Sequence, residues 1–207
     1  MHQDVQEKMY TEIKATCDGR PPLLTDIPNL VYTLCVMYET IRLFPVSGAL
    51  PRRTLKDELL LGKHHIPKNT SIGPDLVSLH RNETYWGNTC NEFDPSRFDN
   101  RDPNRDTEDT TADGKIKFPI RGAFTPFGDG ARVCLGNRPP RVTPDNKAGK
   151  RFAEVEFITC LAMVVERWTI HLGDGWTKED ARSILDASVQ YTTIKPPSNI
   201  PIVLKKR

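Results

Sequence analysis

Cysteine has the clearest metal-binding chemistry in this sequence, and one of the five cysteines lies in a distinctive pattern. Cys134 stands in Phe-Gly-Asp-Gly-Ala-Arg-Val-Cys-Leu-Gly, residues 127–136, which fits F-x-x-G-x-R-x-C-x-G. Five fixed positions arise by chance in such a chain with odds on the order of one in ten thousand. Because no C-x-x-C pair is present, we expect neither a zinc site nor a disulfide framework. Outside such a pattern, a free cysteine is expected to be a small buried apolar residue, as we predict for Cys17, Cys35, Cys90 and Cys160.

This stretch resembles the cysteine loop of the cytochrome P-450 family, whose members are haem-thiolate monooxygenases. The resemblance implies that Cys134 is the axial ligand of the haem iron. It also implies that Arg132 pairs with a haem propionate and that Phe127 shields the sulfur from water. Gly130 would allow the backbone turn and the close approach, and Gly136 would keep the chain beside the porphyrin as it leaves the cysteine.

Two motifs before the cysteine loop resemble the same family. Glu39 and Arg42 form E-x-x-R ahead of Leu-Phe-Pro, and Arg97 lies in Phe-Asp-Pro-Ser-Arg-Phe, with Ser where Glu is common in the family. Alone, the first motif is weak, because such a pair is usually solvated. The resemblance implies that Glu39, Arg42 and Arg97 form a buried charge network with a structural role. By position, Arg52 is the candidate second propionate partner, with Arg53 next; a solvent-facing strand arginine is the alternative.

The hydrophobic periodicity indicates which elements must position these residues. It predicts helices at residues 3–17, 28–43 and 150–168, a short helix at 75–80, a hairpin within 59–70, an exposed loop at 99–117, a glycine-punctuated loop at 124–136 and a tail hairpin over 189–204. We therefore expect an α+β, mainly helical fold with small β-hairpins and a cysteine loop. The resemblance makes residues 1–207 the C-terminal portion of a single cytochrome P-450 domain.

Charge and composition exclude other classes of protein. The formal net charge is only +2, so nothing points to a nucleic-acid partner. The odd number of scattered cysteines favours a reducing compartment. No apolar run approaches the roughly 18 residues that a membrane span needs. The resemblance places the full-length family member at the cytoplasmic face of the endoplasmic reticulum membrane, with no anchor in this chain.

The resemblance covers nearly the whole chain but only the C-terminal half of the family's usual length. No A-G-x-x-T stretch of the distal helix is present, so no catalytic residue is assignable. Residues 137–149 separate the cysteine from a helix that begins Arg151-Phe152-Ala153, a junction that is direct in the family. Three prolines and no apolar periodicity predict a disordered insert here. Translated intron sequence or a faulty gene model is one interpretation, and a genuine insert is the other.

The implied function is that of a haem-dependent monooxygenase, present as a C-terminal fragment that is inactive alone. The implied cofactor is haem b, iron protoporphyrin IX, and the histidines are not expected to ligate its iron. The implied partners are an NADPH-dependent flavoprotein reductase, because no flavin or nicotinamide motif occurs here, and a small apolar organic substrate. The C-terminal helix resembles that of fungal-type members. The alternative functions are a non-catalytic haem-binding remnant and the product of a faulty gene model.

Overall fold

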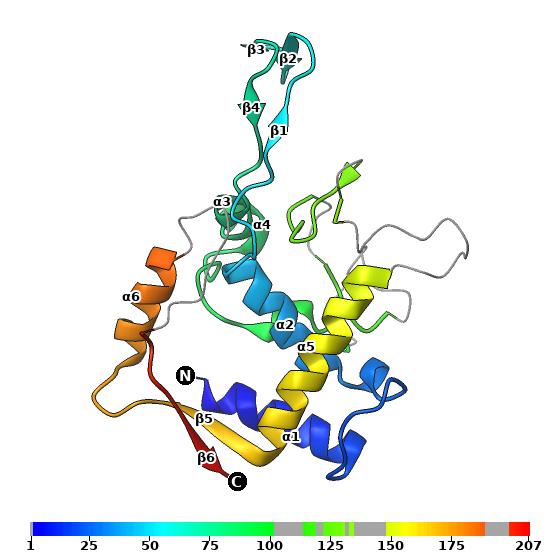
Figure 1. Ribbon diagram of the computed structural model, residues 1–207, viewed down its shortest axis with the longest axis vertical. Coiled ribbons are helices and arrows are strands. Elements are labelled where there is room, and N and C mark those ends of the chain that lie inside the picture. Colours follow the sequence, from blue (N-terminus) through cyan, green and yellow to red (C-terminus); the bar gives the residue numbers. More distant parts are fainter. Residues whose placement is uncertain (1, 102–113, 119–121, 131–132, 135–147, 189–198) are drawn as a thin grey trace.

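The computed structural model describes residues 2–101, 114–118, 122–130, 133–134, 148–188 and 199–207. Within this part, helices predominate beside three two-stranded antiparallel sheets, which confirms the predicted α+β, mainly helical class (Figure 1). The helices are α1 (Gln3–Cys17), α2 (Val31–Leu43), α3 (Leu76–His80), α4 (Glu83–Trp86), α5 (Ala148–Arg167) and α6 (Lys178–Ser188), with 3-10 turns η1 (Ile27–Asn29) and η2 (Pro95–Phe98). The strands are β1 (Arg52–Arg53), β2 (Glu58–Leu60), β3 (His64–Ile66), β4 (Ser71–Ile72), β5 (Trp168–Leu172) and β6 (Ile202–Lys206).

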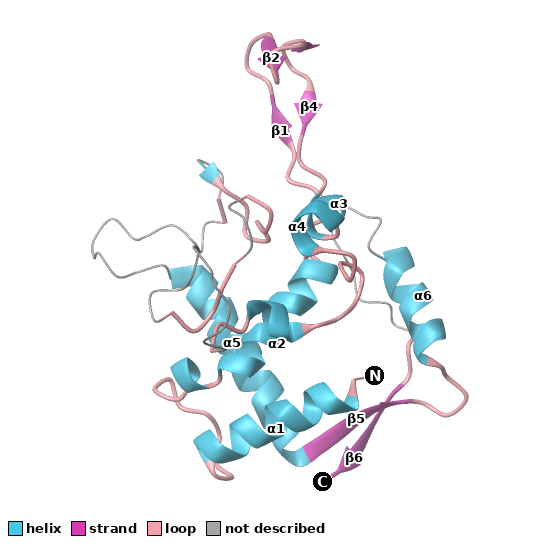
Figure 2. Ribbon diagram, turned by 180° about the vertical axis from the view of Figure 1, so that it is seen from behind, coloured by secondary structure: helices cyan, strands magenta, loops and turns pink. Residues whose placement is uncertain are grey.

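Helices α1, α2 and α5 pack together and form the first core cluster (Figure 2). The buried apolar residues of α1 recur every four positions, which is the spacing of one helix face. The prediction for residues 3–17 is therefore confirmed. Ile158, Ala162 and Val165 supply the facing side of α5. The α1 members of this cluster are Val5, Met9, Ile13 and Cys17.

The helix predicted over residues 28–43 is divided in the structure. Pro28 lies in η1, and α2 begins at Val31, because Leu30 has non-helical backbone angles. The first amides of α2 have no partner within the helix. The carboxylate of Glu12, from α1, accepts the backbone N–H of Tyr32 at 2.7 Å and that of Thr33 at 2.9 Å. A side chain from a neighbouring helix thus caps α2.

Helix α2 is buried on two sides, because a second core cluster packs against the face turned away from α1. This cluster is aromatic, and its rings come from α2, α4, η2 and the segments at 114–118 and 122–130. Its buried members are Val31, Cys35, Tyr38, Trp86, Cys90, Phe98 and Ile116, with Phe118 and Phe124 packed against them. Two segments that precede Cys134 are therefore packed against α2.

A narrow hairpin projects from this body (Figure 1). Strand β1 pairs with β4, with Arg52 opposite Ile72, and beyond it β2 pairs with β3, with Glu58 opposite Ile66. Gly62 closes the tip with a positive φ of 71°, a conformation that glycine adopts without strain. The hairpin predicted within residues 59–70 is confirmed.

The C-terminal region differs from the prediction in two ways. The tail was predicted to pair with itself over residues 189–204, but residues 189–198 lie outside the described ranges and β6 pairs with β5. Alternation in a sequence indicates a strand but not the strand with which it pairs, and here the paired residues lie 30 to 38 positions earlier. Helix α6 was not predicted. Its signal is a capping box, in which Thr177 Oγ1 accepts the N–H of Asp180, and the Asp180 carboxylate accepts the N–H of Thr177.

Helix α5 begins at Ala148, so the last two residues of the predicted insert belong to the helix. No proline follows Pro144 in this region, so the helix can begin before Lys150. The rest of the insert, and residues 102–113 of the predicted exposed loop, lie outside the described residues. Among the described helices, none is long and apolar enough to cross a membrane.

Candidate functional site

The cysteine loop is folded by short-range backbone hydrogen bonds. The N–H of Cys134 donates to the carbonyl oxygen of Phe127 at 2.8 Å, and the N–H of Val133 donates to that of Gly130 at 3.1 Å. Gly128 and Gly130 have φ values of 74° and 68°, in the left-handed region where other residues are strained. The glycines of the motif therefore allow the chain to turn twice between Phe127 and Cys134.

Cys134 is exposed at the end of this turn, and its thiol is free. Cys17, Cys35 and Cys90 are buried, as expected for cysteines that act as small apolar residues. Cys160 is also exposed, so the expectation of burial was wrong for this residue. It lies on the face of α5 turned away from the buried Ile158 and Ala162, and helical spacing alone could not assign that face.

These residues fit an iron-bound macrocycle. Cys134 is exposed, and the hydrogen bond from its backbone N–H to Phe127 fixes the turn on which it lies. A cysteine placed in this way can present a thiolate, which is a ligand of haem iron. Among the described residues, no atom lies within 4 Å of a Cβ built on Gly130, so none of them fills the space next to this turn. Phe127 is half-buried. Arg132 and Gly136 lie outside the described residues.

Glu39 and Arg42 form a fully buried ion pair behind the loop. Arg42 Nε lies 2.7 Å from Glu39 Oε2, Arg42 Nη2 lies 2.7 Å from Glu39 Oε1, and both side chains have 0% exposure. Arg42 also donates to the carbonyl oxygens of His80 at 2.7 Å, Cys90 at 2.6 Å and Glu92 at 3.0 Å. All the N–H donors of the guanidinium are thereby used. One side chain of α2 thus bonds both the end of α3 and the turn at residues 90–92.

Arg97 lies at the edge of this pair. Its Nε is 3.5 Å from Glu39 Oε1, and its other nitrogens donate to the carbonyl oxygens of Trp86 at 3.1 Å and Thr89 at 2.6 Å. Glu39 additionally accepts the backbone N–H of Asp94 at 2.8 Å. The structure thus brings together Glu39, Arg42 and Arg97, the three charged residues that the motifs single out. They pair with one another and bond the backbone of the scaffold.

His80 is a site residue that the motifs did not identify. It is completely buried, and its Nε2 accepts the backbone N–H of Thr125, two residues before Phe127, at 3.2 Å. Its ring centroid lies 5.1 Å from that of Phe124. Burial lowers the pKa of His80 to about 4, so the ring is neutral at pH 7. Only the fold reveals this contact, because the two residues are 45 positions apart.

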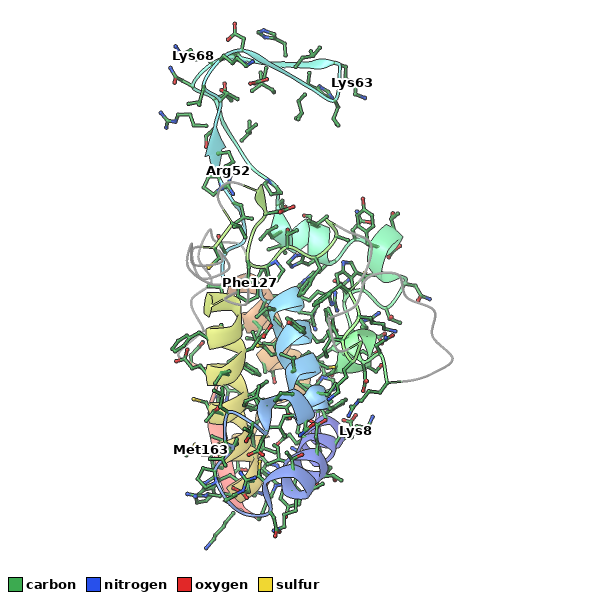
Figure 3. The ribbon with its side chains drawn as sticks, turned by 90° about the vertical axis from the view of Figure 1, so that its right-hand side faces the viewer. Lys8, Arg52, Lys63, Lys68, Phe127 and Met163 are labelled. Carbon is green, nitrogen blue, oxygen red and sulfur yellow. The ribbon has the colours of Figure 1, made fainter. Side chains whose placement is uncertain are left out.

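Arg52 lies on the projecting hairpin, apart from Phe127 (Figure 3). It is half-exposed, and its guanidinium donates to the neighbouring carbonyl oxygen of Pro51 at 3.0 Å. Arg53 is exposed. The two arginines line an open hollow with Thr54, Leu55, Lys56, Glu58 and Ile72. Within the described residues, no hydrogen bond or ion pair joins Arg52 to the cysteine loop, so its role as a propionate partner stays a prediction.

Comparison with known proteins agrees with this arrangement. The profile of the Cytochrome P450 family matches residues 1–143, a stretch that contains both charge motifs and the cysteine loop. This chain belongs to the cytochrome P450 family. The match to the cytochrome P450 profile ends at residue 143, within the predicted insert.

Individual cytochromes P450 resemble the chain over most of its length. "Probable cytochrome P450 508A4" of Dictyostelium discoideum is 29% identical over 211 residues, which cover 100% of this chain and 37% of that protein. "Probable cytochrome P450 508A1" of the same organism is 30% identical over 100% of this chain and 35% of its own length. "Cytochrome P450 734A5" of Oryza sativa subsp. japonica is 30% identical over 85% of this chain and 28% of its own length. The chain spans about a third of the length of these relatives. None of the three is named as fungal, so the fungal-type resemblance stays a prediction.

Proposed function

We propose that this chain is the C-terminal portion of a haem-dependent monooxygenase, in which Cys134 is the proximal ligand of the iron. The observation that carries the proposal is that Cys134 is exposed at the end of a turn, where its backbone N–H donates to the carbonyl oxygen of Phe127. This turn lies within the segment that matches the cytochrome P450 family. When bound, haem supplies the iron at which dioxygen is activated, and a thiolate ligand favours that chemistry. The cofactor proposed here is haem b.

Each residue of the motif has a distinct task in this proposal. Cys134 provides the thiolate, and Phe127 covers the sulfur from water. The turn at Gly130 leaves room for the macrocycle beside the loop. Arg132, together with Arg52 of the hairpin, binds the propionates, because guanidinium groups pair well with carboxylates. Gly136 keeps the chain after the cysteine close to the porphyrin.

The longer protein would need further parts. A distal pocket for a small apolar organic substrate, and the groups that deliver protons there, would come from residues that the relatives have and this chain does not span. Electrons would come from an NADPH-dependent flavoprotein reductase, and the whole protein would act at the cytoplasmic face of the endoplasmic reticulum membrane. No observation favours a non-catalytic remnant over this function.

A spectrum of the haem-loaded chain tests the ligand. Reduction and addition of carbon monoxide are expected to give the strongly red-shifted Soret band of a thiolate-bound iron. Cys134→Ala is expected to abolish that band. Cys160→Ala is the matched control, because Cys160 is the other exposed cysteine and should leave the band unchanged. Persistence of the red-shifted band in Cys134→Ala would refute the assignment.

A further inference from the structure

Tyr38 links α2 to α5, the helix that follows the cysteine loop. Its hydroxyl donates to Glu154 Oε1 at 2.5 Å, across 116 positions of sequence. Tyr38 is 1% exposed, and Glu154 lies near the start of α5 and is half-buried. A short hydrogen bond to a carboxylate is among the stronger contacts that two side chains make. The position of the first turns of α5 is therefore set from α2.

The ring of the same tyrosine contacts the chain that precedes the loop. Its centroid lies 6.0 Å from that of Phe124 at an interplanar angle of 86°, and 5.3 Å from that of Phe118 at 77°. Both are edge-to-face arrangements, which aromatic pairs favour. Phe124 is three residues before Phe127, where the cysteine loop begins. Tyr38 thus contacts both the segment that precedes the cysteine loop and the helix α5 that follows it.

The platform for these contacts is rigid. Tyr38 is adjacent to Glu39, whose carboxylate is fixed by Arg42, so α2 is anchored at the point from which Tyr38 projects. Burial raises the pKa of Tyr38, and the phenol is therefore a donor toward Glu154 at any ordinary pH. The direction of the hydrogen bond is fixed by this protonation state.

We propose that Tyr38 is a positioning residue that clamps the cysteine loop, with Phe124 held before Cys134 and Glu154 held after it. From α2, the clamp holds Phe124 before the loop and the first turns of α5 after it. Tyr38 affects the position of the Cys134 sulfur only through its contacts with Phe124 and Glu154. Its importance for the reaction rests on the proposed function of Cys134 as the iron ligand.

Amide hydrogen exchange on the chain without haem tests the clamp itself. Tyr38→Phe and Glu154→Ala each remove the hydrogen bond, and exchange at residues 122–130 and 152–158 is expected to accelerate together, by about tenfold or more. The double variant should be no faster than Glu154→Ala, since Tyr38→Phe then removes a hydrogen bond that is already lost. Glu154→Gln keeps an acceptor oxygen and should stay near wild type.

Tyr32→Phe is the matched control, because Tyr32 is also a buried tyrosine of α2 but packs in the cluster with α1. It should leave exchange at both flanks unchanged. If Tyr38→Phe fails to fold, Glu154→Ala carries the test, because it alters only a half-buried residue. Unchanged exchange at residues 122–130 in both variants would overturn the clamp.

The haem-loaded chain supplies a second readout. At equal haem content, Tyr38→Phe should shift the ferrous carbon monoxide spectrum from the red-shifted thiolate band toward the shorter-wavelength band, whereas Tyr32→Phe should not. An unaltered spectrum in Tyr38→Phe, beside a wild-type thiolate band, would contradict the role toward the iron. Absence of the thiolate band from the wild type would instead refute the proposed function, and the exchange data would still decide the clamp.

Discussion

Glu39 and Arg42 lie one turn apart on α2 and pair through two hydrogen bonds of 2.7 Å, with neither side chain exposed to solvent. Burying a charge costs several kcal/mol, and a buried ion pair offsets this cost only if all its hydrogen-bond partners are present. Here the carbonyl oxygens of His80, Cys90 and Glu92 complete the donors of Arg42. The pair consequently holds the chain between α3 and η2 against α2.

Breaking this pair is expected to destabilise the fold strongly. Glu39→Gln leaves the Arg42 charge buried without its counter-ion, and Arg42→Leu takes the guanidinium away from the buried carboxylate and from three carbonyl oxygens. Each should lower the free energy of unfolding by about 3–5 kcal/mol, measured by urea denaturation. Lys14→Met is the control, because the Lys14–Asp18 pair is exposed and should contribute about 0.5 kcal/mol or less. A loss at Arg42 as small as that at Lys14 would contradict the structural role.

Acid is expected to weaken the contact between His80 and the segment before the cysteine loop. The pKa of His80 is about 4 in the folded chain and near 6.5 when the chain unfolds. Because the folded pKa is the lower one, the unfolded state binds more protons between these values. Stability is therefore complete above pH 6.5 and declines as the pH falls toward 4, by about 3 kcal/mol in total.

His80→Gln tests this pH dependence, because glutamine does not titrate and its amide oxygen can accept the N–H of Thr125. The decline between pH 6.5 and 4, followed by urea denaturation, should become shallower in this variant. His65→Gln, on the exposed hairpin, should leave the decline as it is. The same pH dependence in wild type and His80→Gln would show that another group is responsible.

Residues 137–147 are expected to be dispensable for haem binding. They interrupt the junction between the cysteine and the following helix, and α5 begins only at Ala148. Removal of these residues should leave the thiolate band of the ferrous carbon monoxide complex intact or stronger, since Tyr38 and Glu154 still hold α5. Loss of haem binding on deletion would make the segment a structural part of the site.

The chain alone is not expected to turn over substrate. It spans 37% of the length of the Dictyostelium discoideum relative that it matches throughout, and a closed pocket on the other haem face needs more chain than this. The test supplies haem, a matched flavoprotein reductase and NADPH, and measures product across a panel of apolar substrates. Reductase-dependent hydroxylation would overturn the expectation and require a distal pocket within these 207 residues.

The sequence predicts those features that depend on local spacing. The buried stripe of α1 follows from its four-residue repeat, and the turn before Cys134 follows from its glycines. Contacts between distant residues leave no such signal. Neither the partner of β6 nor the hydrogen bond from Tyr38 to Glu154 can be read from a period or a motif, because each depends on how helices and strands pack.

The five hydrogen bonds of Arg42 also constrain the order in which the chain can fold. Its carbonyl partners lie 38 to 50 positions later, so during synthesis α2 emerges long before the groups that neutralise and bond its guanidinium. Until they arrive, that arginine is more stable in water than in a core, and α2 cannot be buried. The turns around residues 80–92 and the helix should therefore become protected in one cooperative step, and a nascent chain that ends before Glu92 should remain open to proteases at α2.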